Sequence, residues 1–436
     1  MNYKTPGAYI EEISKFPPSV AQVETAIPAF IGYTAIATET EPVRITSLLE
    51  YETIFGGANP ETGISATITE GKVEITHTSV SPNIMYYTLQ MYFANGGGPC
   101  YIVSAGDYSN TPSDGDLTTA MAKLEKEDEP TLLVIPEASG LAADKAYLKV
   151  YSDALTQAER LQDRFVIIDT SSASDLRDNL PLSSNLKYGA AYYPNLNTVL
   201  SYAYDETTID VVIDSDPAVK LDTLKTTNST DYNAVKAEIS SIPVVLPPSG
   251  AIAGVYAKVD STSGVWKAPA NLGLSYVIGP TVKITKVEQD GLNVDEDAGK
   301  SINAIRSFTG KGTLVWGART LDGNSNEWRY VPVRRFFNMV EESVKKASER
   351  FVFESNDANT WIRVRAMIEN FLNQQWKAGA LAGAKAEDAY YVRVGLNETM
   401  TAVDVLNGRM IVEIGMAAVR PAEFIVLRFS HKLQES

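Results

Sequence analysis

Continuous apolar runs alternate with helical patterns through the first two thirds of the chain. The runs at 132–135 and 165–168 are apolar at every position, which is typical of strands covered by helices on both faces. Further patterns predict strands and helices in turn, the strands at 29–36, 100–104, 131–136, 165–169 and 189–193, the helices at 83–94, 115–127 and 143–163. The alternation predicts an α/β fold with a doubly wound, largely parallel sheet.

Two polar segments interrupt this alternation. The Thr-rich stretch at 60–80 alternates with period two around a turn at Glu70-Gly71, which predicts a β-hairpin or a small insertion. The stretch at 205–245 is rich in Thr and Asp and predicts an exposed excursion from the sheet. A helix is expected to begin near Ser249, after the prolines that mark the return.

The last third of the chain has a different order of predicted strands and helices. Its patterns predict strands at 313–316, 330–333, 390–395 and 410–415, and helices at 334–353 and 360–376. This mixture indicates a separate α/β domain. The predicted division is therefore an extended N-terminal arm at 1–30, a first α/β domain at 31–275, a second at 276–420, and a C-terminal arm at 421–436.

Both ends of the sequence are β-rich and apolar. Near the C-terminus, Ile425, Leu427 and Phe429 fall on one face of a strand and Phe424 and Val426 on the other. Such segments either complete a sheet in their own molecule or pair with the sheet of a neighbour, which would link chains into a polymer. The residues expected to form these strand arms are Tyr9, Ile10, Ile13, Phe424, Ile425, Val426, Leu427 and Phe429.

Composition places the chain among soluble globular proteins. Its 436 residues, 44% hydrophobic and 21% charged, suggest two or three domains. The opening lacks the features of a signal peptide, and no apolar run approaches the roughly 20 residues of a membrane span. We therefore expect no direct membrane insertion and no Sec-type export. The single cysteine, Cys100, excludes an intramolecular disulfide and fits synthesis in a reducing cytosol.

Charge is unevenly distributed along the chain. The net charge of −16 argues against non-specific nucleic-acid binding. Residues 1–298 carry 19 Lys and Arg against 39 Asp and Glu, whereas residues 299–436 carry 19 against 15. An acidic body and a mildly basic last third indicate either two surfaces with different partners or the solvation of one large acidic domain.

The sequence offers no catalytic, cofactor or metal constellation. The two histidines, His77 and His431, lie in the β-rich insertion and at the chain end, and neither has a plausible partner nearby. The Gly299-Lys300-Ser301 string lacks the upstream glycine of a phosphate-binding loop. Gly96-Gly97-Gly98 precedes a strand instead of a helix, so it is interpreted as a connector. We expect no enzyme activity and no cofactor.

One basic constellation remains. Arg334 and Arg335 open a predicted helix that also carries Lys345, Lys346 and Arg350. The helix is either an ordinary solvated helix with Glu–Lys pairs at i,i+4 spacing or an electrostatic contact for an acidic partner.

Several ordered strings resemble the contractile tail sheath family of contractile phages, R-type pyocins and extracellular contractile injection systems. The strings cover nearly the whole chain, and each is weak alone: 3–13, 16–20, 26–34, 93–98, 248–256, 264–271, 315–320, 330–335 and 421–424. The resemblance implies a subtilisin-like α/β domain without protease activity, facing outward, and an inward C-terminal domain. It also implies that both arms add strands to the sheets of adjacent subunits.

The resemblance further implies that a basic helix of the C-terminal domain holds an inner tube. The matching helix runs from Arg334 to Phe353, so the expected tube contacts are Arg334, Arg335, Lys345, Lys346 and Arg350. The segments at 60–80 and 205–245 match the family least well and are interpreted as outward-facing parts specific to this system.

The expected function is a structural subunit of a sheath that polymerises helically around a tube and contracts to drive it through a target envelope. Expected partners are the chain itself, paralogous sheath subunits, the inner tube, and baseplate and terminal cap proteins. Assembly is expected in the bacterial cytoplasm, before the sheath joins a phage tail or an extracellular particle. The alternatives are an α/β hydrolase and a monomeric binding module.

Overall fold

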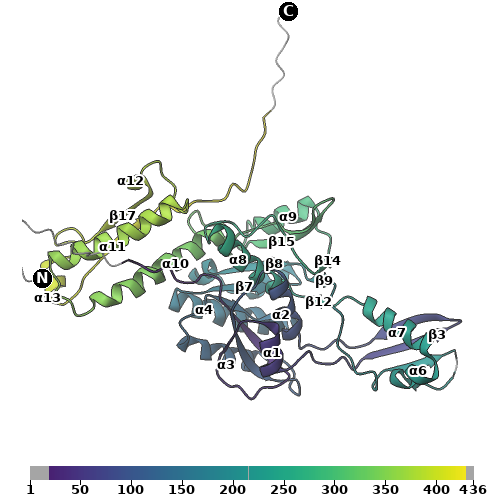
Figure 1. Ribbon diagram of the computed structural model, residues 1–436. Helices are drawn as coiled ribbons and strands as arrows, with labels where there is room; N and C mark the ends of the chain where they lie inside the picture. The colour runs from purple at the N-terminus through teal and green to yellow at the C-terminus, as the bar shows by residue number, and fades with distance from the viewer. Residues whose placement is uncertain (1–18, 215, 429–436) are drawn as a thin grey trace, which may run out of the picture. The chain divides into compact units, whose positions relative to one another are not determined.

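The computed structural model describes residues 19–214 and 216–428 (Figure 1). The expected arm residues Tyr9, Ile10, Ile13 and Phe429, and also His431, lie outside these ranges. The chain forms two compact units. Among the described residues, we call the part made of 24–214, 216–339 and 420–428 the sheet unit. Residues 19–23 and 340–419 make up the helical unit.

A nine-stranded sheet organises the sheet unit. Six central strands run parallel and stand in the order β5–β1–β6–β7–β8–β15. Their bounds are β1 Pro28–Thr34, β5 Cys100–Asp107, β6 Leu132–Val134, β7 Phe165–Asp169, β8 Gly189–Tyr193 and β15 Ile302–Phe308. Antiparallel strands complete both edges: β2 (Val43–Ile45) beyond β5, and β16 (Gly312–Val315) and β13 (Leu272–Gly273) beyond β15. The predicted mixed α/β fold and its central strands are confirmed.

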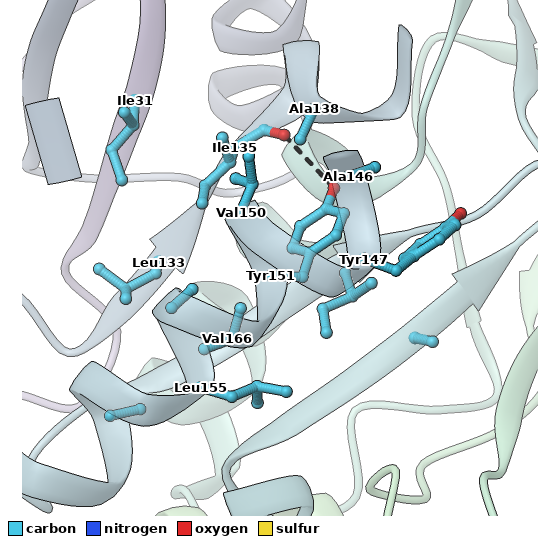
Figure 2. Packing of buried hydrophobic residues seen from close by; sticks show 14 of the residues in the cluster. Ile31, Leu133, Ile135, Ala138, Ala146, Tyr147, Val150, Tyr151, Leu155 and Val166 are labelled. Carbon is cyan, nitrogen blue, oxygen red and sulfur yellow. Dashed lines mark hydrogen bonds between the residues drawn. The ribbon is translucent and has the colours of Figure 1, made fainter. Parts of the chain in front are cut away.

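Helices bury one face of this sheet. Ile31 of β1 and Val166 of β7 lie in a core cluster with Tyr151 and Leu155, as Figure 2 shows. The buried hydroxyl of Tyr151 donates to the carbonyl oxygen of Ile135 at 3.4 Å. The helices on this face are α3 (Asp114–Lys123), the π-helix η3 (Asp144–Tyr151), α4 (Ser152–Leu161) and α5 (Ala173–Asn179).

The alternate residues of the same strands face a second core. Phe30 of β1 and Phe165 of β7 pack there with Tyr192 and Tyr256, whose hydroxyls lie 2.6 Å apart. The covering helices are α1 (Leu48–Phe55), α2 (Met85–Ala94) and α8 (Ser249–Ser263). Burial of alternate residues on opposite faces explains why these strands are apolar at every position.

Short elements connect the sheet to its surroundings. A three-stranded antiparallel sheet contains β9 (Leu196–Thr198), β12 (Val245–Leu246) and β14 (Val277–Pro280). Helix α9 (Lys286–Asn293) precedes β15 and packs against it. Since β15 and β16 extend the large sheet, the unit boundary lies between Met339 and Val340 rather than at the predicted 275/276.

The two polar segments fold together as a small domain within the sheet unit. Hairpin β3–β4 (Ile64–Thr69 and Lys72–His77) pairs in parallel with β10 (Asp210–Ile213), which pairs with β11 (Val219–Lys220). Figure 1 shows α7 (Ser229–Ser241) and α6 (Leu221–Thr227) beside β3. Residues from both segments share one core: Ile64, Ala66, Ile68, Val211, Leu221, Leu224, Val235 and Ile239. Hairpin β3–β4 lies within the segment where a hairpin was predicted, and 205–245 leaves the large sheet but contributes buried residues to this shared core.

The helical unit is built on two long helices. Helix α10 (Val331–Ser348) crosses the unit boundary and continues into a 3-10 turn, η5 (Glu349–Phe351). Helix α11 (Ala358–Lys377) buries Val364, Ile368 and Leu372. The remaining elements are α12 (Ala386–Ala389), β17 (Tyr390–Arg393), α13 (Ala402–Leu406) and β18 (Glu413–Met416). The predicted strand at 330–333 was wrong, because α10 already begins at Val331. Pro332 lies in the first turn of this helix, where proline is tolerated.

None of the helices formed by residues 19–214 and 216–428 combines the length and apolarity needed to cross a membrane.

Close packing of α8 on α2 generates a stability prediction. A Cβ atom at Gly250 would lie 2.5 Å from the carbonyl oxygen of Thr88, and one at Gly254 would lie 2.5 Å from that of Tyr92. Replacing Gly250 by Ala should therefore lower the free energy of unfolding by about 1–3 kcal/mol, measured by denaturant unfolding.

The matched control for this substitution is Gly291→Ala in α9, where an added Cβ meets nothing within 4 Å. That variant should be neutral or slightly stabilising, because Ala favours helix over Gly by about 1 kcal/mol. Equal stability of the two variants would contradict the packing argument.

Candidate assembly surfaces

The C-terminal segment is fixed to the sheet unit at one carboxylate. The Nε and Nη2 atoms of Arg319 donate to the two oxygens of Glu423 at 2.9 and 2.7 Å. Tyr330 donates its hydroxyl at 3.0 Å and Asn293 its side-chain amide at 2.7 Å. Burial acts to raise the pKa of Glu423, but these donors outweigh it and hold the pKa below its ordinary value.

Directly beyond this carboxylate the chain is apolar and exposed. Phe424, Ile425, Val426 and Leu427 expose 70, 78, 77 and 71% of their surface. No strand partner for these four residues exists among the described residues of this chain. Within the described residues, 424–427 therefore complete no sheet in their own molecule, and their pairing stays a prediction. Four adjacent exposed apolar side chains are an unsatisfied hydrophobic surface.

The described residues of the helical unit include a sheet of two strands. Strands β17 and β18 pair antiparallel, from Tyr390 opposite Met416 to Arg393 opposite Glu413. Within the described part of the chain they belong to a two-stranded sheet, which leaves each with one edge not joined to a further strand. An isolated two-stranded sheet is marginally stable, and its open edges are templates for an added strand.

The structure places the first two residues of the expected basic surface in the interior. The Arg334 side chain is only 2% exposed, stacks 4.2 Å from the Trp328 ring, and donates to Asn338 at 2.7 Å. Arg335 is 4% exposed and lies 4.5 Å from the centre of the Tyr256 ring. As a correction, neither guanidinium is placed to meet a partner, because both are enclosed by their own chain.

The remaining basic residues of this helix lie in the helical unit. Lys345 and Lys346 are 62 and 37% exposed and both lie near the Glu342 carboxylate, at 3.1 and 3.6 Å. The Arg350 guanidinium donates to the carbonyl oxygens of Ala347 and Ser19. The structure thus contains the expected Glu342–Lys346 pair, and it holds Arg350 against the N-terminal segment.

The basic character of the last third is largely internal. Residues 299–339 carry 7 Lys and Arg against 2 Asp and Glu, whereas residues 340–419 carry 9 against 11. Four of those seven side chains are buried in the sheet unit: Lys300, Arg319, Arg334 and Arg335. The excess of positive charge therefore reflects buried cations more than a basic surface.

Groups with catalytic potential serve structural roles. The Nζ atom of Lys300 donates to the carbonyl oxygen of Arg177 at 2.6 Å and also contacts that of Leu180 at the end of α5, which agrees with the rejection of a phosphate loop. His77 lies 3.1 Å from Glu61 and against the Tyr202 ring. No group of three His, Cys, Asp or Glu suited to a metal ion occurs among residues 19–214 and 216–428.

A buried serine and aspartate meet at the start of α8. The Ser249 amide donates to Asp169 at 2.8 Å, and both residues are fully buried. Burial raises the pKa of the Asp169 carboxyl to about 7. His77, the histidine within the described residues, contacts Glu61 and Tyr202 instead. The Asp169 carboxyl thus accepts the amide of the first residue of α8, and both side chains are enclosed by the protein.

Sequence reasoning missed the carboxylate cluster. Glu423 and Arg319 are 104 residues apart, and neither has a local pattern that marks a buried ion pair. The only signal was that Glu423 and Arg319 both fall in strings that resemble the sheath family.

Comparisons with known proteins agree with one family. Residues 324–432 match the model of the phage tail sheath C-terminal domain. The fold resembles a chain of the contracted sheath complex of the extracellular contractile injection system PVC, with a TM-score of 0.68 and 32% identity over 100% of this chain and 99% of that one. It also resembles a chain of the anti-feeding prophage baseplate, with a TM-score of 0.70 and 33% identity over 99 and 100%.

A tail sheath protein of Vibrio phage KVP40 is 25% identical over 188 residues. The match covers 42% of this chain and 26% of the length of the phage protein. The chain belongs to the contractile sheath protein family. Members of this family are structural proteins, so an enzymatic role is excluded by family membership.

The buried Asp169 carboxyl generates a prediction on pH. Its folded pKa of about 7 exceeds its ordinary value of 3.8, so the unfolded chain gives up this proton more readily. The contribution to stability is full below pH 4 and is lost as the pH rises toward 7. Asp169→Asn cannot ionise and keeps an acceptor for Ser249, so its melting temperature should rise relative to the unsubstituted chain across that window.

Thermal unfolding at several pH values between 4 and 8 would measure this difference. The control is Asp153→Asn in α4, where the side chain is 40% exposed, and its difference should stay nearly constant. A constant difference for Asp169→Asn as well would contradict the argument.

Proposed function

We propose that this chain is the structural subunit of a contractile sheath that polymerises helically around an inner tube. On triggering, the sheath contracts and drives the tube through a target envelope. The observation that carries the proposal is the likeness, over essentially the full length of both chains, to a subunit of a contracted sheath complex. The hydrolase alternative has no support from family membership, and a monomeric binding module leaves the exposed C-terminal segment without a role.

Strand exchange is the proposed link between subunits. The apolar segment Phe424–Leu427 lacks a partner in the described chain, and β17–β18 offers open edges. A segment from one copy could add to the β17–β18 sheet of a neighbouring copy, gaining backbone hydrogen bonds and burying its side chains. Head-to-tail contacts that do not close into a ring generate a helical polymer. The N-terminal arm, with Tyr9, Ile10 and Ile13, has the same proposed role.

Contraction needs a lattice that changes shape without coming apart. In this proposal the subunits move as nearly rigid bodies while the exchanged strands remain paired, because the linkers absorb the movement. The extended lattice is held by contacts with the tube and baseplate, and the contracted lattice has the lower free energy. No nucleotide is then required.

The proposed tube contact is smaller than the sequence indicated. Because Arg334 and Arg335 are enclosed, the proposed contact consists of Lys345, Lys346 and Arg350. The Lys345 side chain is 62% exposed, more than that of Lys346. Further proposed partners are paralogous sheath subunits, the baseplate and a terminal cap. We place assembly in the bacterial cytoplasm, before incorporation into a phage tail or an extracellular particle.

The subtilisin-like description of the sheet unit is also part of this proposal. It is supported by the parallel order β5–β1–β6–β7–β8 and by helices on both faces of the sheet. The small domain formed by 60–80 and 205–245 is proposed to face outward.

Truncation tests strand exchange. A chain ending at Glu423 lacks the exposed apolar segment but keeps the carboxylate that contacts Arg319. It should remain folded, with an unchanged circular dichroism spectrum, and form no sheath-like tubes by negative-stain electron microscopy under conditions where the full chain does. Normal tubes from the truncated chain would exclude an essential role for this arm.

Charge reversal tests the tube contact. The double variant Lys345→Glu, Lys346→Glu should reduce the fraction of extended, tube-filled sheaths several-fold when co-expressed with the tube protein, because it replaces attraction with repulsion. The matched control reverses Lys145 and Lys149, which are also exposed and carboxylate-paired. If both pairs of substitutions gave the same particles by electron microscopy, the proposed contact would be wrong.

A further inference from the structure

We propose that Glu423 anchors the exchanged C-terminal strand. The strand inserts into a second copy of this chain, while Glu423 keeps it fixed to the sheet unit of the copy from which it comes. The inference rests on the proposed strand exchange and goes beyond it by naming the residue that carries the connection. Without an anchor, tension on an inserted strand would first peel the C-terminal segment from its own unit.

The geometry at Glu423 suits an anchor. One carboxylate accepts four hydrogen bonds from Arg319, Tyr330 and Asn293, at 2.7 to 3.0 Å. The two bonds from Arg319 form the bidentate arrangement that is strong and directionally specific. Arg319 is 4% exposed, so removing its carboxylate would leave a buried cation without its partner. The segment therefore changes at Glu423 from firmly held to exposed.

The anchor is continuous with the central sheet. The side chain of Asn303 on β15 accepts from the Arg319 amide at 2.8 Å and donates to the Arg319 carbonyl at 2.8 Å. The same side-chain amide reaches the carbonyl oxygen of Ala191 on β8 at 3.1 Å. A pull on the arm is thus transmitted through Glu423 and Arg319 to two paired strands of the nine-stranded sheet.

A second cluster of the same chemistry binds the N-terminal segment of the sheet unit. Arg335 donates to both oxygens of Asp260, at 3.1 and 2.5 Å, and to the carbonyl oxygen of Thr25 at 2.9 Å. Thr25 also donates its hydroxyl to Asp260 at 2.6 Å. Thr25 and Glu423 lie near the two points where the chain passes between units at its ends, Val23/Glu24 and Val419/Arg420. Near each point, the chain is hydrogen-bonded to a buried arginine of the sheet unit, Arg335 or Arg319.

The test compares sheath polymers made from full-length chains. Glu423→Gln keeps the size of the side chain but removes its charge, and Tyr330→Phe removes one donor. Both variants should form tubes. Tubes of Glu423→Gln should dissociate in urea at least about tenfold faster than unsubstituted tubes, which corresponds to about 1.4 kcal/mol, and those of Tyr330→Phe should dissociate about threefold faster. Amide hydrogen exchange in residues 420–428 should rise in parallel.

The control is Asp153→Asn, which breaks an exposed ion pair with Lys149 and should leave dissociation unchanged. If Glu423→Gln does not fold, Tyr330→Phe decides the question. Dissociation equal to that of the control, while the chain truncated at Glu423 forms no tubes, would overturn the anchor and leave strand exchange intact. Normal tubes from the truncated chain would overturn both.

Discussion

The burial of both faces of the parallel sheet is the constraint on which the rest of this molecule depends. Each central strand sends alternate side chains into two separate cores, so that Ile31 and Phe30 of one strand lie on opposite faces. Helices must then cover both sides, and all connections between parallel strands must cross over the sheet. The small domain is inserted in connections outside the central strands, and α10 and the C-terminal segment follow the last strand of the large sheet.

Buried arginines make these attachments specific. Arg319 and Arg335 each bind a carboxylate from a distant part of the sequence, and Arg334 stacks on the Trp328 ring. Burying such a cation is costly unless its partners are in place, so each cluster favours one arrangement of the segments that it joins. Positive charge in this region organises the subunit itself, while the helical unit beyond it carries slightly more negative than positive residues.

Much of the sheet could be predicted from the sequence, and the reasons are local. Strand Phe165–Asp169 is a continuous apolar run, and helix Met85–Ala94 has apolar residues at helical spacing and ends before a glycine-rich turn. The candidate site could be predicted less well. The apolar arm after Glu423 could be predicted from its composition, but the burial of Arg334 and Arg335 depends on Trp328, Tyr256 and Asp260, which only the folded chain brings to them. The boundary at Met339/Val340 was missed because β15 pairs with β8, whose residues 189–193 lie far earlier in the sequence.

The small domain has a consequence for how such subunits can diverge. Its core takes Ile64, Ala66 and Ile68 from one segment and Val211 and Val235 from another, joined by parallel pairing between Ser65 and Asp210 and their neighbours. Either segment alone would expose half of an apolar core to water. The two segments must therefore be acquired, exchanged or lost together, although residues 81–204, which include much of the central sheet, separate them in the sequence. A change in one segment therefore requires a compatible change in the other, even though the two segments are separate insertions in the sequence.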